Sequence, residues 1–415
     1  MTTARRVIIA GVGPAGLALA VTLARSGLSV RCFDAGAGAL WTNNYGIWAE
    51  DARWFGEAGQ QGLRWNRPAI IGADGRQYVV PSAYHMLPNK QLQAQWQAEL
   101  AALGGSVVAR KVTGVESKAD GLVNCTLDDG SQETADLFVD ATGGTSPWVA
   151  RERSPSPGFQ TAWGTTIRAS LADLPLQGAD MALMDFRPAS AQTGPTPPTF
   201  VYAMPVGTDT VFVEETVLVA APAVAPEQLQ DRLRERLRTW GLHDREELHH
   251  ERCVIPMGQA LPIASQPLLA WGAAAGMVHP ASGYSIGHTV RWASQAAPAI
   301  AELVNTPMPA ERRQTLLWQH VWPLERRRAW RLYRFGMDVL LKMNAGELGE
   351  FFLNFFECDA ERALLFMRFD LTDRQLAELM LDFYRAVPGS IRWRLTMAGV
   401  GPSGLGLAGR WFTDR

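Results

Sequence analysis

The sequence predicts an α/β fold with a domain built on a parallel sheet, a second domain with a mixed sheet, and a helical C-terminal region. Three observations predict it: a strand–helix–strand unit at the N-terminus, β-rich runs over residues 199–219, and a helical pattern from about residue 306 to 398. With 415 residues, 47% of them apolar, the chain is long enough to bury a large core.

The N-terminal unit begins with a short apolar run, Val7–Ala10, of the kind that forms a buried parallel strand. Three glycines follow in the spacing GxGxxG, and an Ala- and Leu-rich stretch, Leu17–Ser26, predicts a helix that Gly27 ends. A second strand is expected at Leu28–Phe33, and it runs directly into Asp34. The acid falls at about the spacing that Rossmann-type nucleotide-binding units show.

The order of these features predicts a dinucleotide site. The first glycine permits a tight turn, the second lets backbone N–H groups approach a pyrophosphate, and the third lets helix and strand pack closely. The acid at the end of the second strand can accept hydrogen bonds from ribose hydroxyls. The residues predicted to bind here are Gly11, Gly13, Pro14, Ala15, Gly16 and Asp34. The alternative is a glycine-rich turn without a ligand.

Two later strand-to-glycine turns favour FAD over NAD as the dinucleotide. The strand Leu137–Val139 ends in Asp140-Ala-Thr-Gly143, and the strand Leu268–Trp271 runs into a Gly- and Ala-rich turn. Small residues there let the backbone lie close to a flavin ring. The residues predicted to bind in these turns are Asp140, Gly143, Gly276, Met277, His279 and Pro280. The alternative is that both turns are ordinary loops at the edge of a sheet.

These turns divide the chain into interleaved segments. We predict an FAD-binding domain from residues 1–40, 100–150 and 265–305, a substrate domain from 41–99 and 151–264, a helical region over 306–398 and a flexible tail over 399–415. Within the substrate domain, Gly207-Thr208-Asp209 between two β-rich runs predicts a hairpin. Leucines at 229, 233 and 237 predict an amphipathic helix over 226–241.

Two adjacent carboxylates, Glu214 and Glu215, stand out because they lie inside an apolar β run, Phe212-Val-Glu-Glu-Thr216. Neighbouring residues of a strand point to opposite faces, so only one of the two faces a given cavity. A carboxyl group held against apolar walls has a raised pKa and can donate a proton at neutral pH. The alternatives are a solvated pair on an edge strand or a carboxylate with an arginine partner.

Composition argues against several other classes of protein. A net charge of −2 argues against nucleic-acid binding. Four cysteines without CxxC spacing and seven histidines without HExxH spacing predict a reducing compartment and no metal site. The sequence contains no run of 18 apolar residues, so we expect no membrane-spanning helix. The first motif begins by residue 7, so we expect no signal peptide.

Fifteen tryptophans are unusually many for this length. Two of them flank the segment Trp41-Thr-Asn-Asn-Tyr-Gly-Ile-Trp48, whose aromatic faces either stabilise a cation or pack at a domain junction. Others accompany the arginines between Arg312 and Arg334. Arginines beside aromatic residues suit an interfacial helix on an anionic membrane, or an exposed arginine face over an aromatic core.

Taken in order, the motifs resemble those of the lycopene cyclases, especially the plant-type β-cyclases and their bacterial counterparts, over nearly the whole chain. The resemblance rests on GxGxxG, Asn43–Trp48, Pro198–Pro205, Phe212–Thr216, Cys253–Gly258, Gly276–Pro280 with Gly283-Tyr284, and Phe351-Phe352 with Phe355-Phe356. Val213 stands where the family usually has Leu, and Gln259 stands where it usually has Gly.

The resemblance implies an FAD-containing fold of the p-hydroxybenzoate-hydroxylase type, with Gly283 in the cofactor turn. It implies that the linear ψ ends of lycopene or γ-carotene close to β rings without net redox change, with FAD reduced and NAD(P)H as the electron source. Glu214 is then expected to be the principal acid/base residue and Glu215 the second. A lipid-dissolved substrate implies peripheral attachment to a membrane, which we expect on the cytoplasmic side.

Two rival classes keep the same nucleotide site. A flavin-dependent monooxygenase or halogenase would use it to oxidise an aromatic substrate, and a prenyl-chain reductase would use it to saturate double bonds. The carboxylates within an apolar strand argue against the first class. A carotenoid-binding protein without activity would have no need of a dinucleotide site.

Overall fold

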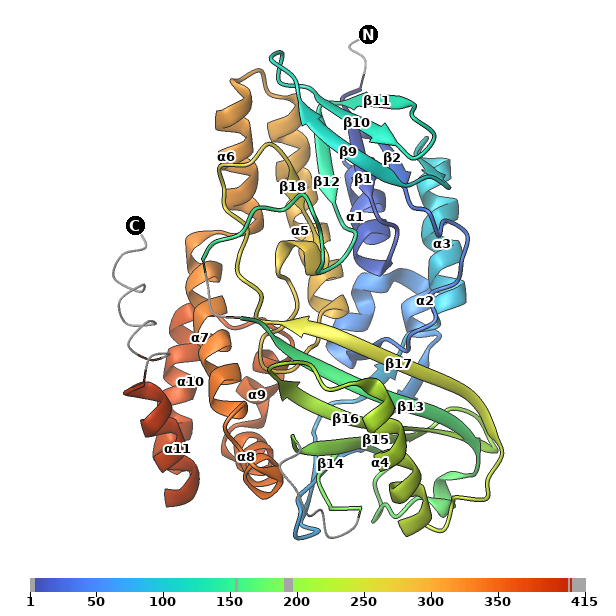
Figure 1. The fold of residues 1–415 in the computed structure, drawn as a ribbon, viewed down its shortest axis with the longest axis vertical. Helices are drawn as coiled ribbons and strands as arrows, with labels where there is room; N and C mark the ends of the chain where they lie inside the picture. The colour runs from blue at the N-terminus through green and yellow to red at the C-terminus, as the bar shows by residue number, and fades with distance from the viewer. Residues whose placement is uncertain (1–3, 154–155, 190–196, 402–403, 405–415) are drawn as a thin grey trace.

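The structure is a computed structural model that describes residues 4–153, 156–189, 197–401 and 404. Figure 1 shows an upper half built around the N-terminal strands, a lower half built around a large sheet, and a column of helices along one side. The predicted α/β class with a mixed sheet and C-terminal helices is confirmed. Most of the predicted tail, 399–415, lies outside the described residues.

A five-stranded parallel sheet forms the centre of the upper half. Its order is β18 (Leu269–Ala270), β12 (Leu137–Asp140), β1 (Arg6–Ala10), β2 (Ser29–Phe33) and β8 (Ser106–Val108). The apolar run predicted as the first strand lies in the middle of this sheet, where both of its faces are covered. The sheet therefore brings together strands that are up to 260 residues apart in the sequence.

Helices and a small sheet cover the parallel sheet. Helix α1 (Pro14–Arg25) packs against α5 (Ile286–Asn305) and α3 (Asn89–Ala102). The antiparallel strands β9 (Val112–Ser117), β10 (Val123–Leu127) and β11 (Gln132–Ala135) lie beside β1 at the top of Figure 1. The domain boundaries predicted from the sequence are not tested by this arrangement and stay a prediction.

The lower half is a seven-stranded mixed sheet in which only β14 and β5 pair in parallel. Its order is β17 (Glu247–Met257), β13 (Gly158–Arg168), β16 (Thr210–Ala220), β15 (Thr199–Pro205), β14 (Met181–Asp185), β5 (Pro68–Ile71) and β6 (Gln77–Val79). The predicted hairpin is the β15–β16 turn, and the predicted amphipathic helix is α4 (Pro226–Thr239), packed on one face of the sheet.

A fourth sheet, of three strands, completes the sheets of the described residues. It consists of β3 (Gly46–Trp48), β7 (Tyr84–Met86) and β4 (Leu63–Trp65), with the 3₁₀ helix η1 (Ala49–Phe55) and the short helix α2 (Gly56–Gln60) after β3. Two further 3₁₀ turns, η2 (Leu171–Asp173) and η3 (Gly272–Ala275), complete the short elements.

The helical region expected over 306–398 is a run of six helices. They are α6 (Ala310–Val321), α7 (Leu324–Leu340), α8 (Ala345–Cys358), α9 (Ala360–Met367), α10 (Asp373–Ala386) and α11 (Gly389–Gly399). Capping boxes begin α8 and α10, where the side chains of Asn344 and Thr372 accept from backbone N–H groups. Trp318, Trp322 and Trp330 are buried, so the aromatic-core interpretation holds for these three.

A buried charge network ties η1 to the helices. Asp51 accepts hydrogen bonds from Arg291 Nη1 at 2.6 Å and from Arg368 Nη2 at 2.9 Å. All three side chains are less than 10% exposed. The partly exposed Asp370 lies 3.3 Å from Arg291 and 3.7 Å from Arg368. Asp51 therefore carries most of the compensation for two buried cations.

Replacing Asp51 by Asn should lower the free energy of unfolding by about 3–5 kcal/mol, because breaking a buried ion pair leaves charge without compensation. Chemical denaturation followed by circular dichroism measures the change. The matched control is Glu378→Gln, which removes the solvent-exposed partner of Arg374 on α10. Equal losses in the two variants would contradict the importance given to Asp51.

Candidate active site

The alternation of side chains along β16 sends Glu214 and Glu215 to opposite faces of the large sheet. Glu214 pairs in register with Tyr202 of β15 and with Gly164 of β13. Gly164 in turn pairs with Glu251 of β17. Residues paired across strands share a face, so Tyr202, Glu214 and Glu251 stand in one row on the same side. This row forms one wall of a cavity.

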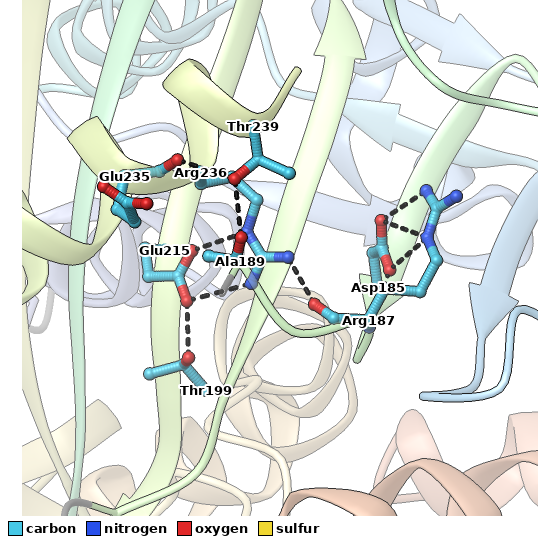
Figure 2. Close-up of polar contacts among 8 residues, drawn as sticks. All are labelled: Asp185, Arg187, Ala189, Thr199, Glu215, Glu235, Arg236 and Thr239. Atoms are coloured by element: carbon cyan, nitrogen blue, oxygen red, sulfur yellow. Dashed lines mark hydrogen bonds and ion pairs between the residues drawn. The ribbon is translucent and has the colours of Figure 1, made fainter. Parts of the chain in front are cut away.

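Glu215 lies on the other side of the sheet, under α4, and is fully buried. Its two oxygens accept hydrogen bonds from Arg236 Nε at 3.1 Å and Nη2 at 3.2 Å, and Thr199 also donates to it (Figure 2). Arg236 donates as well to the carbonyl of Arg187. The arginine-partner interpretation therefore describes Glu215, and its contacts serve to hold α4 on the sheet.

The cavity has a volume of about 310 Å³, within the range of small-molecule sites. Its sheet wall contains Tyr202, Met204, Phe212, Glu214, Glu251 and Cys253, and the opposite walls come from residues 43–46 and 282–286. Ser285 caps the N-terminus of α5 without a side-chain capping bond, and that helix end opens on the cavity. None of the described residues that line the cavity is Lys or Arg.

The side chain of Glu214 is only partly exposed, and it lines the cavity. Burial raises its pKa well above the ordinary value, while a hydrogen bond of 2.9 Å from the Thr216 hydroxyl to Oε1 opposes the shift. With a pKa of about 7, a substantial share of Glu214 keeps its proton at neutral pH. Glu214 thus has the property expected of a proton donor.

Glu251 is a second acid in the same cavity. Its oxygens accept from the Asn44 backbone N–H at 2.9 Å and from Asn44 Nδ2 at 2.7 Å. Burial raises the pKa of Glu251, the charge of Glu214 raises it further, and the two Asn44 donors lower it. The cavity therefore holds two carboxyl groups that compete for protons.

Aromatic side chains surround the acids. Tyr84, Tyr202 and Tyr284 line the cavity, and burial raises the pKa of each phenol, so all three are neutral. Trp48 packs behind them, with ring centroids 5.3 Å from Tyr84 and 6.3 Å from Tyr284. The packing interpretation of Trp41–Trp48 thus applies to Trp48, which lies in the core, while Asn43, Asn44 and Tyr45 face the cavity. Stabilisation of a cation by this segment stays a prediction.

The three glycine turns predicted separately from the sequence meet at the start of α1. A Cβ on Gly11, whose φ is +98°, would lie 2.5 Å from the carbonyl oxygen of Ala141 in the second turn. A Cβ on Gly272 would lie 2.7 Å from Ala15 Cβ, and one on Gly16 would lie 2.1 Å from the Gly11 carbonyl oxygen. Close backbone contact therefore requires glycine at these positions.

Gly13 differs, because a Cβ there would meet nothing within 4 Å. It caps α1 without a side-chain hydrogen bond, and Pro14 begins the helix. The helix N-terminus thus offers its N–H groups to open space, which is the arrangement that binds a pyrophosphate. These features fit the phosphates of a dinucleotide.

The two acids predicted to bind the dinucleotide accept hydrogen bonds from the loops around the start of α1. Asp34 accepts from the Val12 N–H at 2.8 Å and from the Gly36 N–H at 2.7 Å, which leaves further acceptor capacity for a ribose. Asp140 is fully buried and accepts from Thr142 N and Oγ1 and from Ser146. Asp140 therefore shapes the second turn, which contains Gly143 at φ +107°.

The third turn divides into two layers. Gly283 lines the cavity, while Met277, His279 and Pro280 are buried behind it. His279 Nδ1 accepts from the N–H groups of Ala281 and Ser282 at 3.1 and 3.0 Å, and burial lowers its pKa to about 3. A neutral His279 thus folds the turn and packs on Tyr333. Gly276 adopts φ +76° at the end of η3.

The sequence reasoning did not select Glu251 or Asn44 as site residues. Strand β17 was missed because its first half, Glu247–Arg252, is polar and mostly exposed. The available signal was the alternation of Glu251, Cys253 and Ile255, which places one acid among less polar neighbours on one face. Within the described ranges, no group of three or more His, Cys, Asp or Glu could hold a metal ion.

Comparison with known proteins identifies relatives over most of the chain. A family model described as "Lycopene cyclase protein" matches residues 6–392. A lycopene beta cyclase of Arabidopsis thaliana is 33% identical over 361 residues, covering 84% of this chain and 71% of that protein. A lycopene beta cyclase of Synechococcus elongatus is 33% identical over 395 residues, covering 94% and 95%.

Solved structures share the fold at lower identity. A geranylgeranyl bacteriochlorophyll reductase-like protein from Thermoplasma acidophilum has a TM-score of 0.66 at 13% identity, covering 92% of this chain and 99% of that one. The flavin-dependent brominase Bmp2 has a TM-score of 0.64 at 15% identity, covering 92% and 100%. The predicted flavoprotein fold is confirmed, and at these identities the likeness shows the fold alone.

The two neighbouring acids should differ in their effect on stability. Glu215→Gln leaves Arg236 buried without a full counter-charge and should cost about 3 kcal/mol or more. Glu214→Gln replaces a protonated carboxyl by an amide of similar shape. Because the folded-state pKa of Glu214 is raised, stability falls as pH rises from the unfolded-state pKa to the folded-state pKa.

Glu214→Gln should therefore match the wild type near pH 4 and exceed it near pH 8. Thermal unfolding of the wild type and of Glu214→Gln across this pH range measures the difference in stability. A stability loss for Glu214→Gln as large as that for Glu215→Gln would be inconsistent with the assignment of the two faces.

Proposed function

The chain belongs to the lycopene cyclase family, and from that premise we propose that its cavity closes the linear ends of lycopene, or of a related carotene, into β rings. The observation that carries this proposal is the position of Glu214 inside an apolar, aromatic cavity, where burial raises its pKa. An acid in such a place still carries a proton that it can give to an alkene, whereas a water-exposed carboxyl group has lost its proton at neutral pH.

The proposed reaction transfers protons and involves no net oxidation or reduction of the carotene. Glu214 gives its proton to the terminal double bond of a ψ end, which leaves a cation at carbon 1. The C5=C6 double bond attacks that cation, and a six-membered ring closes. Loss of the proton from carbon 6 forms the ring double bond, so the product is an isomer of the substrate.

The cavity walls protect the cation. Water would add to a carbocation, so ring closure requires that water be excluded. The sheet wall places Phe212 and Met204 beside Glu214, and neutral phenols add aromatic faces that favour a cation. The absence of Lys and Arg from the described lining residues leaves no positive charge to oppose it.

The glycine turns that meet at the start of α1 support FAD as the resident cofactor. Its pyrophosphate would lie at Gly13 and the start of α1, and its ribose would reach Asp34, as the open space and free acceptors there allow. When bound in its reduced anionic form, with NAD(P)H as the electron source, FAD supplies a negative charge that stabilises a cation.

The rival classes share this fold, since a reductase-like protein and a brominase both resemble it. These likenesses are at 13% and 15% identity, whereas the relatives at 33% are lycopene beta cyclases. Neither rival chemistry needs a protonated carboxyl group in an apolar cavity. The cyclase is therefore the function that the site supports best.

The substrate dissolves in lipid, and α11 supports peripheral attachment to a membrane. Trp393 and Met397 of this helix, with Val400 after it, follow the spacing of one helical face and are 56%, 48% and 63% exposed. Arg392 lies beside this face and is also exposed. An apolar face with basic neighbours suits an anionic bilayer. We place this attachment on the cytoplasmic side, in line with the dispersed cysteines.

None of the helices in the described ranges has the length and apolar content needed to cross a bilayer. Attachment by α11 is therefore interfacial in this proposal, and it would bring the enzyme to the layer in which a carotene resides.

Glu214→Gln should abolish ring formation, because an amide has no proton to give to an alkene. The wild type and the variant are expressed in a host that accumulates lycopene, and pigments are separated by chromatography. FAD content of the purified variant, read from its absorbance, should equal that of the wild type. Recovery of β rings from Glu214→Gln would show that another group supplies the proton.

The double variant Trp393→Glu, Met397→Glu should bind anionic phospholipid vesicles at least tenfold more weakly than the wild type, because two buried apolar contacts with lipid are replaced by charges. Co-sedimentation with vesicles measures binding. Leu103→Glu, an exposed leucine beside α3 on the opposite side of Figure 1, is the matched control. Unchanged binding by the double variant would exclude this surface as the attachment site.

A further inference from the structure

We propose that Glu251 is a second catalytic carboxylate: it stays anionic beside the protonated Glu214 and accepts the proton that the ring-closed cation loses from carbon 6. This inference rests on the proposed cyclase function and assigns the proton acceptor of that same site. Four features of the structure support it: the register of the sheet, the packing of Phe212 on Gly164, the hydrogen bonds from Asn44 and the charge of the cavity.

The register fixes the spacing of the two acids. Glu214 and Glu251 both pair with Gly164, which lies on the strand between them. Adjacent strands are about 4.8 Å apart, so the backbones of the two glutamates are separated by about 10 Å. Their side chains project into the same cavity from the same face. A substrate end lying on the Phe212 ring above Gly164 would thus have one acid on each side.

Gly164 makes room for the ring of Phe212 between the two acids. A Cβ at this position would lie 2.5 Å from the ring of Phe212 and 3.2 Å from Glu214 Cβ. Any larger residue would therefore displace the Phe212 ring. The site depends on glycine here for room, and not for an unusual backbone conformation.

The hydrogen bonds divide the roles between the acids. Glu251 accepts two N–H donors from Asn44, one of them a backbone group that can only donate. Glu214 has a single hydroxyl partner, Thr216, which can also accept from a protonated carboxyl. N–H donors stabilise the anionic form of Glu251, and the charge of Glu214, which opposes that anion, is absent while Glu214 keeps its proton. When the pair holds one proton, the arrangement with the proton on Glu214 therefore leaves the negative charge on the acid that has the N–H donors.

The groups that face Glu251 leave its charge without a protein cation. They are Glu214 from β16, Tyr45 from the segment before β3 and Cys253 from its own strand. Burial raises the pKa of Tyr45 to about 12 and that of Cys253 still further, so both stay neutral. The carbocation would be the missing counter-charge, and the anion would stabilise it more than it stabilises the neutral substrate.

The protons balance over one ring. Glu214 gives a proton to the terminal double bond and becomes anionic. Glu251 takes the proton from carbon 6 and becomes neutral, while the electrons of that C–H bond form the ring double bond. The pair holds one proton before and after the reaction, and the proton passes back from Glu251 to Glu214 between turnovers.

The test uses Glu251→Gln in the holoenzyme, assayed on lycopene in vesicles, with Glu246→Gln as the matched control. Glu246 lies just before β17, is exposed and loses the same charge. We expect Glu251→Gln to slow β-ring formation at least tenfold and to release part of the product with the ring double bond displaced. The control should keep the wild-type rate and ring type.

A loss smaller than tenfold with wild-type ring type would overturn the inference. If the wild type forms no rings, the proposed function itself fails. If the wild type is active, Glu214→Gln is inactive and Glu251→Gln behaves as the wild type, only the role of Glu251 fails. FAD content and the unfolding midpoint separate a chemical defect from misfolding.

Asn44→Ala keeps the inference testable if Glu251→Gln does not fold. Loss of the Nδ2 donor raises the pKa of Glu251, so the acidic limb of the pH dependence of kcat/KM should move to higher pH. The basic limb, which reports loss of the proton from the pair, should move less. An acidic limb that stays in place would overturn the proposed anionic role.

Discussion

The buried ion pair between Glu215 and Arg236 fixes which face of β16 meets the cavity. A slip of one residue in this strand would exchange every side chain between the two faces. It would put Glu215 in the cavity and leave Glu214 under α4 opposite an arginine. Because Glu215 is fully buried and paired on both oxygens, such a slip would break this ion pair, and it would also move Val213 out of the apolar core under α4. The buried position of Glu215 therefore fixes Glu214 on the face of β16 that lines the cavity.

The two glutamates show how environment divides one residue type into two roles. Glu215 has the guanidinium group of Arg236 within 3.2 Å and acts as part of the fold. Glu214 has no cation among the described cavity residues and holds its proton because ionisation there is costly. Glu251 combines both influences, because burial and the charge of Glu214 raise its pKa while the N–H donors of Asn44 stabilise its anion. A difference in solvation, rather than in sequence, creates an acid and a base within one sheet.

Much of the fold could be predicted from the sequence, because its signals are local. GxGxxG between two apolar runs gives strand, helix and strand, and the alternation along Phe212–Thr216 separates the two glutamates by face. The site was less predictable, because Glu251, Asn44 and the three tyrosines come from separate segments that only the tertiary fold brings together. The polar sequence at the start of β17 also suggested an exposed segment, although the side chain of Glu251 within it is buried. In the C-terminal region, composition could not show that Trp318, Trp322 and Trp330 pack inside while Trp393 lies outside.

The central claim is that a carboxyl proton, exchangeable with solvent, starts ring closure. A single turnover of the reduced holoenzyme, equilibrated in D₂O and mixed with unlabelled lycopene, tests it most directly when the product is examined by mass spectrometry. The account predicts one deuterium for each ring closed, at the carbon next to the former C1 cation. Rings that form without deuterium, or that take it instead from labelled NAD(P)H, would contradict it.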